Sequence, residues 1–289
     1  MSDTEVPLER RQIFAMGGGG FTMEPANPLL DDFVLSLADS RAAGQEPRIR
    51  EPRILFLPTA SGDTAAQIAA FYERYSDRLC IPEHLSLFHL RDARRSLSET
   101  VLSQDIVYVG GGSMRNLLAI WRAHKLDRLL TRAWRRGIVL AGISAGAMCW
   151  FEGGVTRSSG PPEPMAGLGL LQGSLTVHAD GEPERLPVWL DALRAGRLPG
   201  GWAVDDGAGL LFAGTHLQRI VSSRPGAGAQ RVDQVAGELV RHRLSPELLG
   251  AHDPLESVAA MDEDVRELRR EHRLRRTASG HRRGLGSGH

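Results

Sequence analysis

A serine between two glycines is the clearest reactive feature of this sequence, in the segment Gly142-Ile143-Ser144-Ala145-Gly146. The apolar run 137–141 precedes it, and small residues that could begin a helix come after it. Gly-x-Ser-x-Gly between a strand and a helix is typical of a nucleophile elbow, a tight turn that presents the serine hydroxyl outward. Glycine suits positions 142 and 146 because side chains there would collide where strand and helix pack. The pattern alone also fits a glycine-rich turn that serves only packing.

A serine nucleophile needs a base that accepts its proton, and His178 is the histidine best placed for this task. It ends an apolar run and enters the turn-rich segment Ala179-Asp180-Gly181, and loops of this kind often carry catalytic groups. His84, His89 and His124 are more simply explained as surface or core-edge residues. An exposed loop histidine without a catalytic role remains the alternative for His178.

The carboxylate that would orient this base is not decided by the residues alone. The downstream candidates are Asp180, Glu182, Glu184, Asp191, Asp205 and Asp206. Asp205 and Asp206 follow an apolar strand-like run, and because side chains alternate along a strand, one of the two would point inward. An inward carboxylate needs a hydrogen-bond partner, which an imidazole N–H would supply. A simple Asp-Gly turn is the alternative at this position.

Strands and helices alternate five times in the first half of the chain. We expect strands at 12–16, 53–58, 85–90, 105–109 and 137–143, with a long helix at 114–136 before the last of them. This alternation predicts an α/β fold with a doubly wound, mostly parallel sheet flanked by helices. Short strands between 202 and 232 suit antiparallel additions to the sheet in the C-terminal part.

Two glycine-rich loops come directly after predicted strands. Gly110-Gly111-Gly112-Ser113 follows the fourth strand as Ser144 follows the fifth. Ligands of such sheets bind beyond the carboxyl ends of the strands, and consecutive strands are usually neighbours, so we expect the two loops to face one pocket. The run Gly17–Gly20 lacks the spacing of a dinucleotide-binding fingerprint, and we interpret it as a tight turn at the rim of the sheet.

The composition narrows the class of protein and of partner. Lys and Arg (35) balance Asp and Glu (35), so we expect neither nucleic acid nor a membrane as partner. No apolar run is long enough to span a bilayer and no secretory signal begins the chain, which predicts a cytoplasmic protein. Cys80 and Cys149 lack metal-type spacing and are expected to be buried thiols; no metal or cofactor is expected.

The same patterns suggest the domain organisation. Residues 1–11 are a polar leader, residues 12–254 would form one α/β domain, and the charged segment 255–289 has the composition of a disordered tail. The sequence leaves open whether copies of the chain assemble into a homo-oligomer.

Several of these segments together resemble the peptidase E family, which contains aspartyl dipeptidases and cyanophycinases. They are Ile106–Ser113, Gly142–Ala147, His178 and Asp205-Asp206-Gly207, and the similarity runs in order over roughly residues 12–231. The resemblance implies a class I glutamine amidotransferase-like sheet. It further implies a serine peptidase that cleaves a small peptide substrate through an acyl-enzyme, with the triad in the order Ser, His, acid.

The resemblance also implies residue roles. Ser144 would be the nucleophile, His178 the base and Asp206 the acid, where the dipeptidases have Glu. The oxyanion donors would be the backbone N–H groups of Gly112 and Ala145. Substrate-binding residues would be Ser113 and Arg185, since the dipeptidases hold an aspartate carboxylate with an arginine after the catalytic histidine; Arg157 is a further candidate. Arg185 could instead be exposed on the helix expected at 182–195.

Two other functions fit the same fold. A glutaminase of the amidotransferase type would carry cysteine at the elbow, where this chain has Ser144, while Cys149 lies in the helix after it. A catalytically idle, small-molecule-binding or regulatory protein would not need the Ser, His and acid positions. Their presence favours the peptidase.

Overall fold

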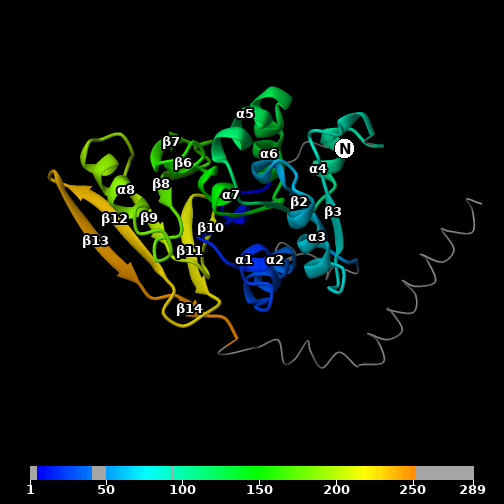
Figure 1. Cartoon of the computed structure of the whole chain (residues 1–289). Coiled ribbons are helices and arrows are strands. Elements are labelled where there is room, and N and C mark those ends of the chain that lie inside the picture. Colours follow the sequence, from blue (N-terminus) through cyan, green and yellow to red (C-terminus); the bar gives the residue numbers. More distant parts are fainter. Residues whose placement is uncertain (1–4, 41–49, 93, 251–289) are drawn as a thin grey trace, which may run out of the picture. The chain divides into compact units, whose positions relative to one another are not determined.

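The computed structural model describes residues 5–40, 50–92 and 94–250. The chain divides into a unit Met1–Leu249 and a segment Gly250–His289. Figure 1 labels the helices and strands of the first unit. The tail expected at 255–289 and residues 1–4 of the expected leader lie outside the described residues.

An eight-stranded sheet contains four of the five strands expected from the first half of the chain, and its strand order is β14-β11-β10-β1-β5-β4-β2-β3. Its strands are β1 (Gln12–Met16), β2 (Arg53–Leu57), β3 (Ile81–His84), β4 (Ile106–Val109), β5 (Val139–Ile143), β10 (Ala208–Ala213), β11 (His216–Ser222) and β14 (Glu247–Leu248). Strands β1, β5, β4, β2 and β3 run parallel to one another; β10 pairs antiparallel with β1, and β11 pairs antiparallel with β10. The predicted α/β fold, with antiparallel strands added from the C-terminal part, is confirmed.

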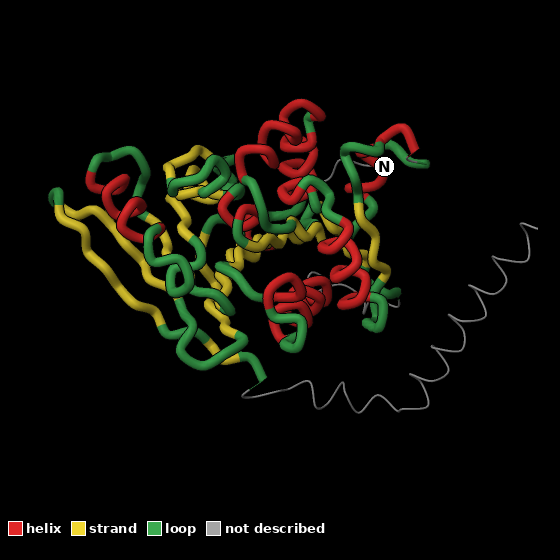
Figure 2. The backbone as a smooth tube through the Cα atoms, viewed as in Figure 1, coloured by secondary structure: helices red, strands yellow, loops and turns green. Residues whose placement is uncertain are grey.

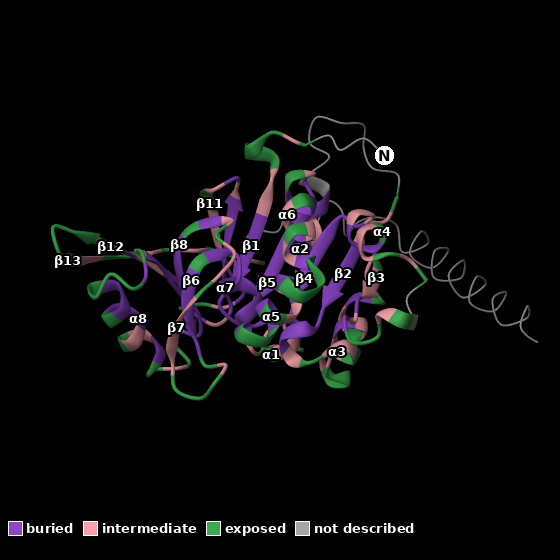
Figure 3. Ribbon diagram, turned by 90° about the horizontal axis from the view of Figure 1, so that it is seen from above, coloured by how far each residue is buried: buried purple, intermediate pink, exposed green. Residues whose placement is uncertain are grey.

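Helices cover both faces of this sheet, as Figure 2 shows with the strands between two groups of helices. The helices before β6 are α1 (Gly20–Met23), α2 (Leu29–Ser40), α3 (Ala65–Tyr75), α4 (Leu97–Leu102), α5 (Met114–His124), α6 (Leu126–Arg135) and α7 (Ala145–Met148). Side chains alternate along β1, so that Phe14 and Met16 pack with α2 while Ile13 and Ala15 pack with α5 and α7. The central strands β1, β2, β4 and β5 are therefore almost entirely buried (Figure 3).

Two local predictions differ from the structure. The third strand is Ile81–His84 rather than 85–90; Phe88 is exposed, and Pro82 is tolerated because β3 lies at the edge of the sheet. The helix expected at 114–136 is interrupted at Lys125, whose left-handed backbone (φ 57°) separates α5 from α6. Short 3₁₀ turns occur at Leu8–Arg10, Thr59–Ser61 and Leu90–Asp92.

A second sheet was not foreseen from the sequence. Its six strands are β6 (Phe151–Thr156), β7 (Glu163–Ala166), β8 (Leu171–Thr176), β9 (Gly201–Val204), β12 (Ala229–Val235) and β13 (Glu238–Leu244), in the order β13-β12-β9-β8-β6-β7. Strands β6, β8 and β9 run parallel, and α8 (Arg185–Arg194) packs against this sheet. An isolated parallel bridge between Gly18 and Asp206 joins the loop after β1 to the loop after β9.

The strand order brings the functional loops together at one edge. Strands β1, β5 and β4 are neighbours, so the loops after them, which begin at Gly17, Ser144 and Gly110, lie side by side. The carboxyl ends of β8 and β9 deliver His178 and Asp206 to the same place. In the part of the chain that the structure describes, no helix is both long and apolar enough to cross a membrane.

Candidate active site

Ser144 occupies a strained turn between β5 and α7. Its φ of 54° and ψ of −114° are conformations that non-glycine residues rarely adopt and that cost about 1–3 kcal/mol. The flanking glycines permit this turn: a Cβ on Gly142 would lie 2.0 Å from the carbonyl oxygen of Gly146, and a Cβ on Gly146 would lie 2.4 Å from that of Val109. The Ser144 N–H donates to the Met16 carbonyl (3.1 Å), which fixes the elbow to β1. The strand–turn–helix context expected of a nucleophile elbow is thus present.

His178 lies between Ser144 and Asp206. Its Nε2 is 2.9 Å from Ser144 Oγ, and its Nδ1 is 2.5 Å from Asp206 Oδ1. Since an ionised carboxylate only accepts hydrogen bonds, Nδ1 carries the proton, and Nε2 is left to accept from the serine hydroxyl. His178 is buried, with 8% of the residue exposed. This arrangement matches the geometry of a Ser-His-Asp triad.

Of the acids that the sequence left open as partners of His178, Asp206, Asp205 and Glu182 lie in different surroundings. Asp206 contacts the imidazole, whereas the buried Asp205 accepts from the Gly228 N–H (3.0 Å) and lies 3.4 Å from Arg243. Burial raises the pKa of Asp205. Burial also opposes ionisation of Glu182, but the hydrogen bond and charge of Arg185 outweigh it and lower the pKa of that carboxyl.

The glycine turn after β1 also belongs to this site. A Cβ on Gly18 would lie 1.9 Å from Asp206 Oδ1 and 2.9 Å from His178 Nδ1. The Gly18 carbonyl accepts from the Gly207 N–H (3.0 Å). From the sequence, Gly17–Gly20 was interpreted only as a tight turn at the rim of the sheet. The sequence signal for a place in the active site was a glycine run directly after a parallel strand. Its close approach to the His178–Asp206 pair appears only in three dimensions.

The loop after β4 packs directly against the elbow. A Cβ on Gly111 would lie 3.3 Å from the Ser144 Cβ. At Gly112 the backbone has φ 139°, and a Cβ there would lie 2.3 Å from the Ala60 carbonyl oxygen, so only glycine fits. That carbonyl accepts from the Ser113 N–H (2.8 Å), which ties the loop to the turn after β2. Ala145 is the first residue of α7, so its N–H has no acceptor within the helix.

The two residues predicted to bind substrate already have partners in the protein. Ser113 caps α5, because its Oγ accepts from the Asn116 N–H (3.1 Å). Arg185 is buried rather than exposed: its Nη2 donates to Glu182 Oε2 (2.8 Å) and its Nη1 to the Val155 carbonyl (2.7 Å). Substrate binding by Ser113 and Arg185 stays a prediction.

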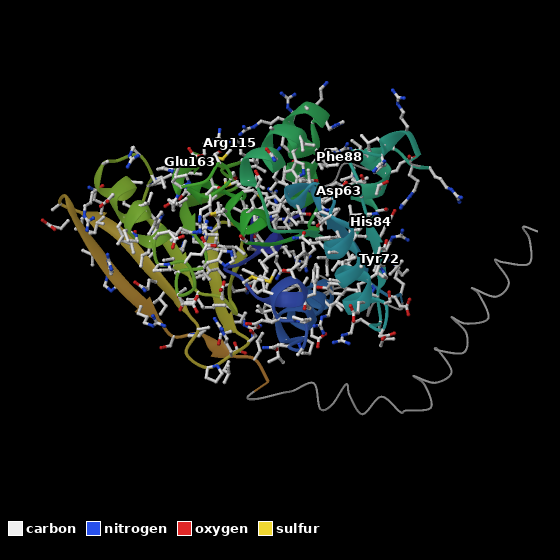
Figure 4. All side chains as sticks on the ribbon, in the orientation of Figure 1. Asp63, Tyr72, His84, Phe88, Arg115 and Glu163 are labelled. Carbon is white, nitrogen blue, oxygen red and sulfur yellow. The ribbon has the colours of Figure 1, made fainter. Side chains whose placement is uncertain are left out.

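The loop between β6 and β7 borders the site. Arg157 in this loop pairs with Glu184 (2.6 Å) and Glu182 (3.5 Å), close to the segment that carries His178. At the other end, Arg115 of α5 pairs with Glu163 (2.7 Å), and the two are neighbours in Figure 4. The loop therefore connects the start of α5 with the loop after β8.

The histidines set aside from the sequence lie elsewhere. His84 is on β3, where its Nδ1 is 2.9 Å from the Tyr72 hydroxyl, and Figure 4 labels both residues. His89 and His124 are exposed. Among the described residues, no group of three or more His, Cys, Asp or Glu side chains is arranged to hold a metal ion.

Comparison with known proteins identifies relatives of this chain. The model of peptidase family S51 matches residues 13–220. The uncharacterized peptidase YgaJ of Bacillus subtilis (strain 168) is 45% identical over 240 residues, which cover 83% of this chain and all of that protein. A crystal structure of a peptidase from an acI-B1 actinobacterium shares the fold, with a TM-score of 0.62 and 20% identity over 81% of this chain and 94% of the other. The chain therefore belongs to peptidase family S51, the peptidase E family, and is a peptidase.

Proposed function

We propose that this peptidase is a serine enzyme that cleaves short peptides through an acyl-enzyme, with Ser144, His178 and Asp206 as its triad. The observation that carries the proposal is the continuous hydrogen-bonded line from Ser144 Oγ through the imidazole to Asp206 Oδ1, with separations of 2.9 and 2.5 Å. The strained elbow supports it, because strain of this kind collects at functional sites.

In this mechanism the Asp206 carboxylate holds His178 in the tautomer that can accept a proton at Nε2. His178 takes the proton of Ser144 as Oγ attacks the substrate carbonyl, and the backbone N–H groups of Gly112 and Ala145 stabilise the oxyanion. His178 then donates the proton to the leaving amine. A water molecule, activated by the same imidazole, hydrolyses the ester and releases Ser144.

The loop between β6 and β7 lies beside the triad, and the family resemblance suggests short substrates. The loop between β6 and β7 is held at one end by Arg115–Glu163 and at the other by the ion pairs of Arg157, so it borders the site on the side of the second sheet. Dipeptides of the Asp-X or isoaspartyl type are the substrates that the family resemblance suggests. We propose that the enzyme acts on them in the cytoplasm without a cofactor.

A cysteine-dependent reaction is not favoured. Cys149 is buried, its Sγ donates to the Gly146 carbonyl (3.2 Å), and burial raises its pKa well above the usual value. A thiolate nucleophile at this position would be neither formed nor accessible. The assembled Ser-His-Asp line likewise speaks against a catalytically idle protein.

The test is Ser144→Ala, assayed with a panel of dipeptides that includes Asp-X and isoaspartyl peptides. Removing the nucleophile of a triad lowers kcat by about 10⁴ to 10⁶, so turnover should fall to background. The matched control is Ser36→Ala, which removes a helix hydroxyl bonded to the Phe33 carbonyl far along the chain from the triad. Turnover by Ser144→Ala at more than a tenth of the wild-type rate would refute the mechanism.

A further inference from the structure

The predicted acid of the triad is held through its backbone. The Asp206 N–H donates to Asp180 Oδ1 (2.8 Å), and the Asp206 carbonyl accepts from Arg224 Nε (3.0 Å). Arg224 also donates from Nη2 to Asp180 Oδ2 (2.8 Å), which closes a ring of hydrogen bonds around the Asp206 peptide groups. We call Asp180 and Arg224 the backbone clamp.

The clamp is itself tied to the first sheet. The neighbouring Ser223 donates from its N–H to the Gly207 carbonyl (2.8 Å) and from its hydroxyl to Glu24 Oε2 (3.2 Å). Asn27 Nδ2 donates to the Ser223 carbonyl (3.1 Å). These bonds connect the turn that carries Arg224 to the segment after β1, so the arginine approaches Asp206 from a fixed direction.

The position of the Asp206 backbone decides whether its carboxylate can reach His178. The side chain is short and lies between two glycines: a Cβ on Gly18 would be 1.9 Å from Oδ1, and a Cβ on Gly181 would be 2.8 Å from Oδ2. Little room remains for another rotamer. A carboxylate so confined can be aligned only by placing its backbone, and hydrogen bonds to both peptide groups of the residue do that.

The exposure of the clamp indicates that it contributes little to stability. The Arg224 and Asp180 side chains are 42% and 40% exposed, and ion pairs of this kind stabilise a fold only slightly. Yet this pair makes two well-formed hydrogen bonds to the backbone of the residue that contacts the imidazole, and a third joins Arg224 to Asp180. Supporting residues of this type commonly change activity by one to two orders of magnitude when they are removed.

We propose that Arg224 and Asp180 are positioning residues of the peptidase, which align the Asp206 carboxylate with His178 by clamping its backbone. The proposal rests on the function proposed above, because it assigns a task only if Asp206 is the triad acid. Neither residue needs to touch the substrate, so removing one should lower kcat and leave KM nearly unchanged.

The first experiment compares Arg224→Ala with Arg219→Ala. Arg219 is a matched control, because it makes a bidentate ion pair with Glu247 at similar exposure (40% and 58%) and belongs to the neighbouring strand β11. We expect Arg224→Ala to lower kcat about tenfold or more with KM within about twofold of wild type, and Arg219→Ala to leave both unchanged. Equal kcat values in the two variants would overturn the proposal.

The second experiment uses the charges of the clamp. Two charged groups face His178: Asp206, and Glu182, which is paired with Arg185 and Arg157. Asp180 and Arg224 lie behind Asp206, and Glu24 lies 3.9 Å from Arg224. Arg224→Ala removes a positive charge and should move the acidic limb of the kcat/KM profile to higher pH. Asp180→Asn removes a negative charge and should move it to lower pH. A loss of activity without these opposite shifts would contradict the proposal.

Arg224→Lys is a second variant that tests the proposal even if Arg224→Ala folds poorly. Lysine keeps the charge, but its single ammonium group does not reproduce the planar fork that reaches both Asp180 and the Asp206 carbonyl. For Arg224→Lys we expect the acidic limb of the kcat/KM profile to stay at its wild-type pH while kcat is lowered. A wild-type kcat in this variant would refute the role of the backbone clamp. Ser144→Ala in the same assay separates the two proposals. If the Ser144→Ala enzyme is active, the proposed function is wrong. If it is inactive while all variants of Arg224 and Asp180 behave as wild type, only the proposal about the backbone clamp is wrong.

Discussion

Replacing Gly18 with alanine is the sharpest test of the site geometry. The added Cβ would lie 1.9 Å from Asp206 Oδ1 and 2.9 Å from His178 Nδ1. Real Cβ contacts below 3.0 Å essentially do not occur, so the carboxylate or the turn must move by about 1 Å. The φ of Gly18 is not positive, and therefore the substitution acts through this contact rather than through backbone strain.

The size of the effect can be worked out from the hydrogen bond that is lost. A displacement of about 1 Å would stretch the 2.5 Å contact between His178 and Asp206 to the limit of a hydrogen bond. A misplacement of that size costs about 10² in rate, and loss of the acid's orienting role in a serine protease costs about 10⁴. We expect kcat of Gly18→Ala to fall by about 10² to 10⁴, which corresponds to about 3–5 kcal/mol in the activation barrier.

The assay measures kcat and KM on a dipeptide that the wild-type enzyme cleaves, together with the thermal unfolding midpoint. Overpacking should lower stability by about 1–3 kcal/mol, a loss of several degrees in Tm that leaves the protein folded at 25 °C. Gly228→Ala is the control, because a Cβ there would lie 3.4 Å from its nearest neighbour, the Leu244 carbonyl oxygen. A folded Gly18→Ala enzyme with kcat within about threefold of wild type would refute the reasoning.

Further predictions concern the acids and the cysteine. Asp206→Asn should lower kcat by about 10⁴ and Asp205→Asn should change it little, because only Asp206 contacts the imidazole; similar kcat values would contradict this assignment. Burial raises the pKa of the Asp31 carboxyl from 3.8 to about 7 despite the adjacent Arg74. Below pH 4 this carboxyl is protonated in both the folded and the unfolded protein. As the pH rises to about 7 it ionises more readily in the unfolded protein, so the free energy of unfolding falls by up to ~4 kcal/mol. In Asp31→Asn this loss should be absent from denaturant titrations at pH 4 to 8, and an unchanged pH dependence would contradict it. Cys149→Ala should retain activity, and Cys149 in the native enzyme should not react with a thiol reagent.

The local features of the site could be predicted from the sequence because they depend on neighbouring residues. An apolar run, a glycine, a serine and a second glycine predict the turn at Ser144 without knowledge of the rest of the chain. The alternation of strands and helices predicted the parallel sheet for the same reason. The boundaries shifted where a residue broke the local pattern, as Lys125 does between α5 and α6.

Features that depend on distant contacts could not be derived in this way. The sequence suggested that Arg185 could be exposed, whereas packing of α8 on the second sheet buries it with the Val155 carbonyl as a partner. The second sheet itself escaped prediction, because short strands with turns fit either an extension of the first sheet or a separate one. Hydrophobic periodicity specifies which face of a strand is buried but not which strand lies beside it.

The sequence by itself determined the elbow at Ser144, the parallel α/β frame and the order of serine, histidine and acid along the chain. Only the tertiary structure decided that Asp206 rather than Asp205 contacts His178, and that Gly18 lies against both. Residues 18, 178 and 206 belong to loops after β1, β8 and β9, so their separation depends on how the two sheets pack and on the bridge that joins them. No spacing along the chain encodes that distance, because it is set by contacts among residues far apart in sequence.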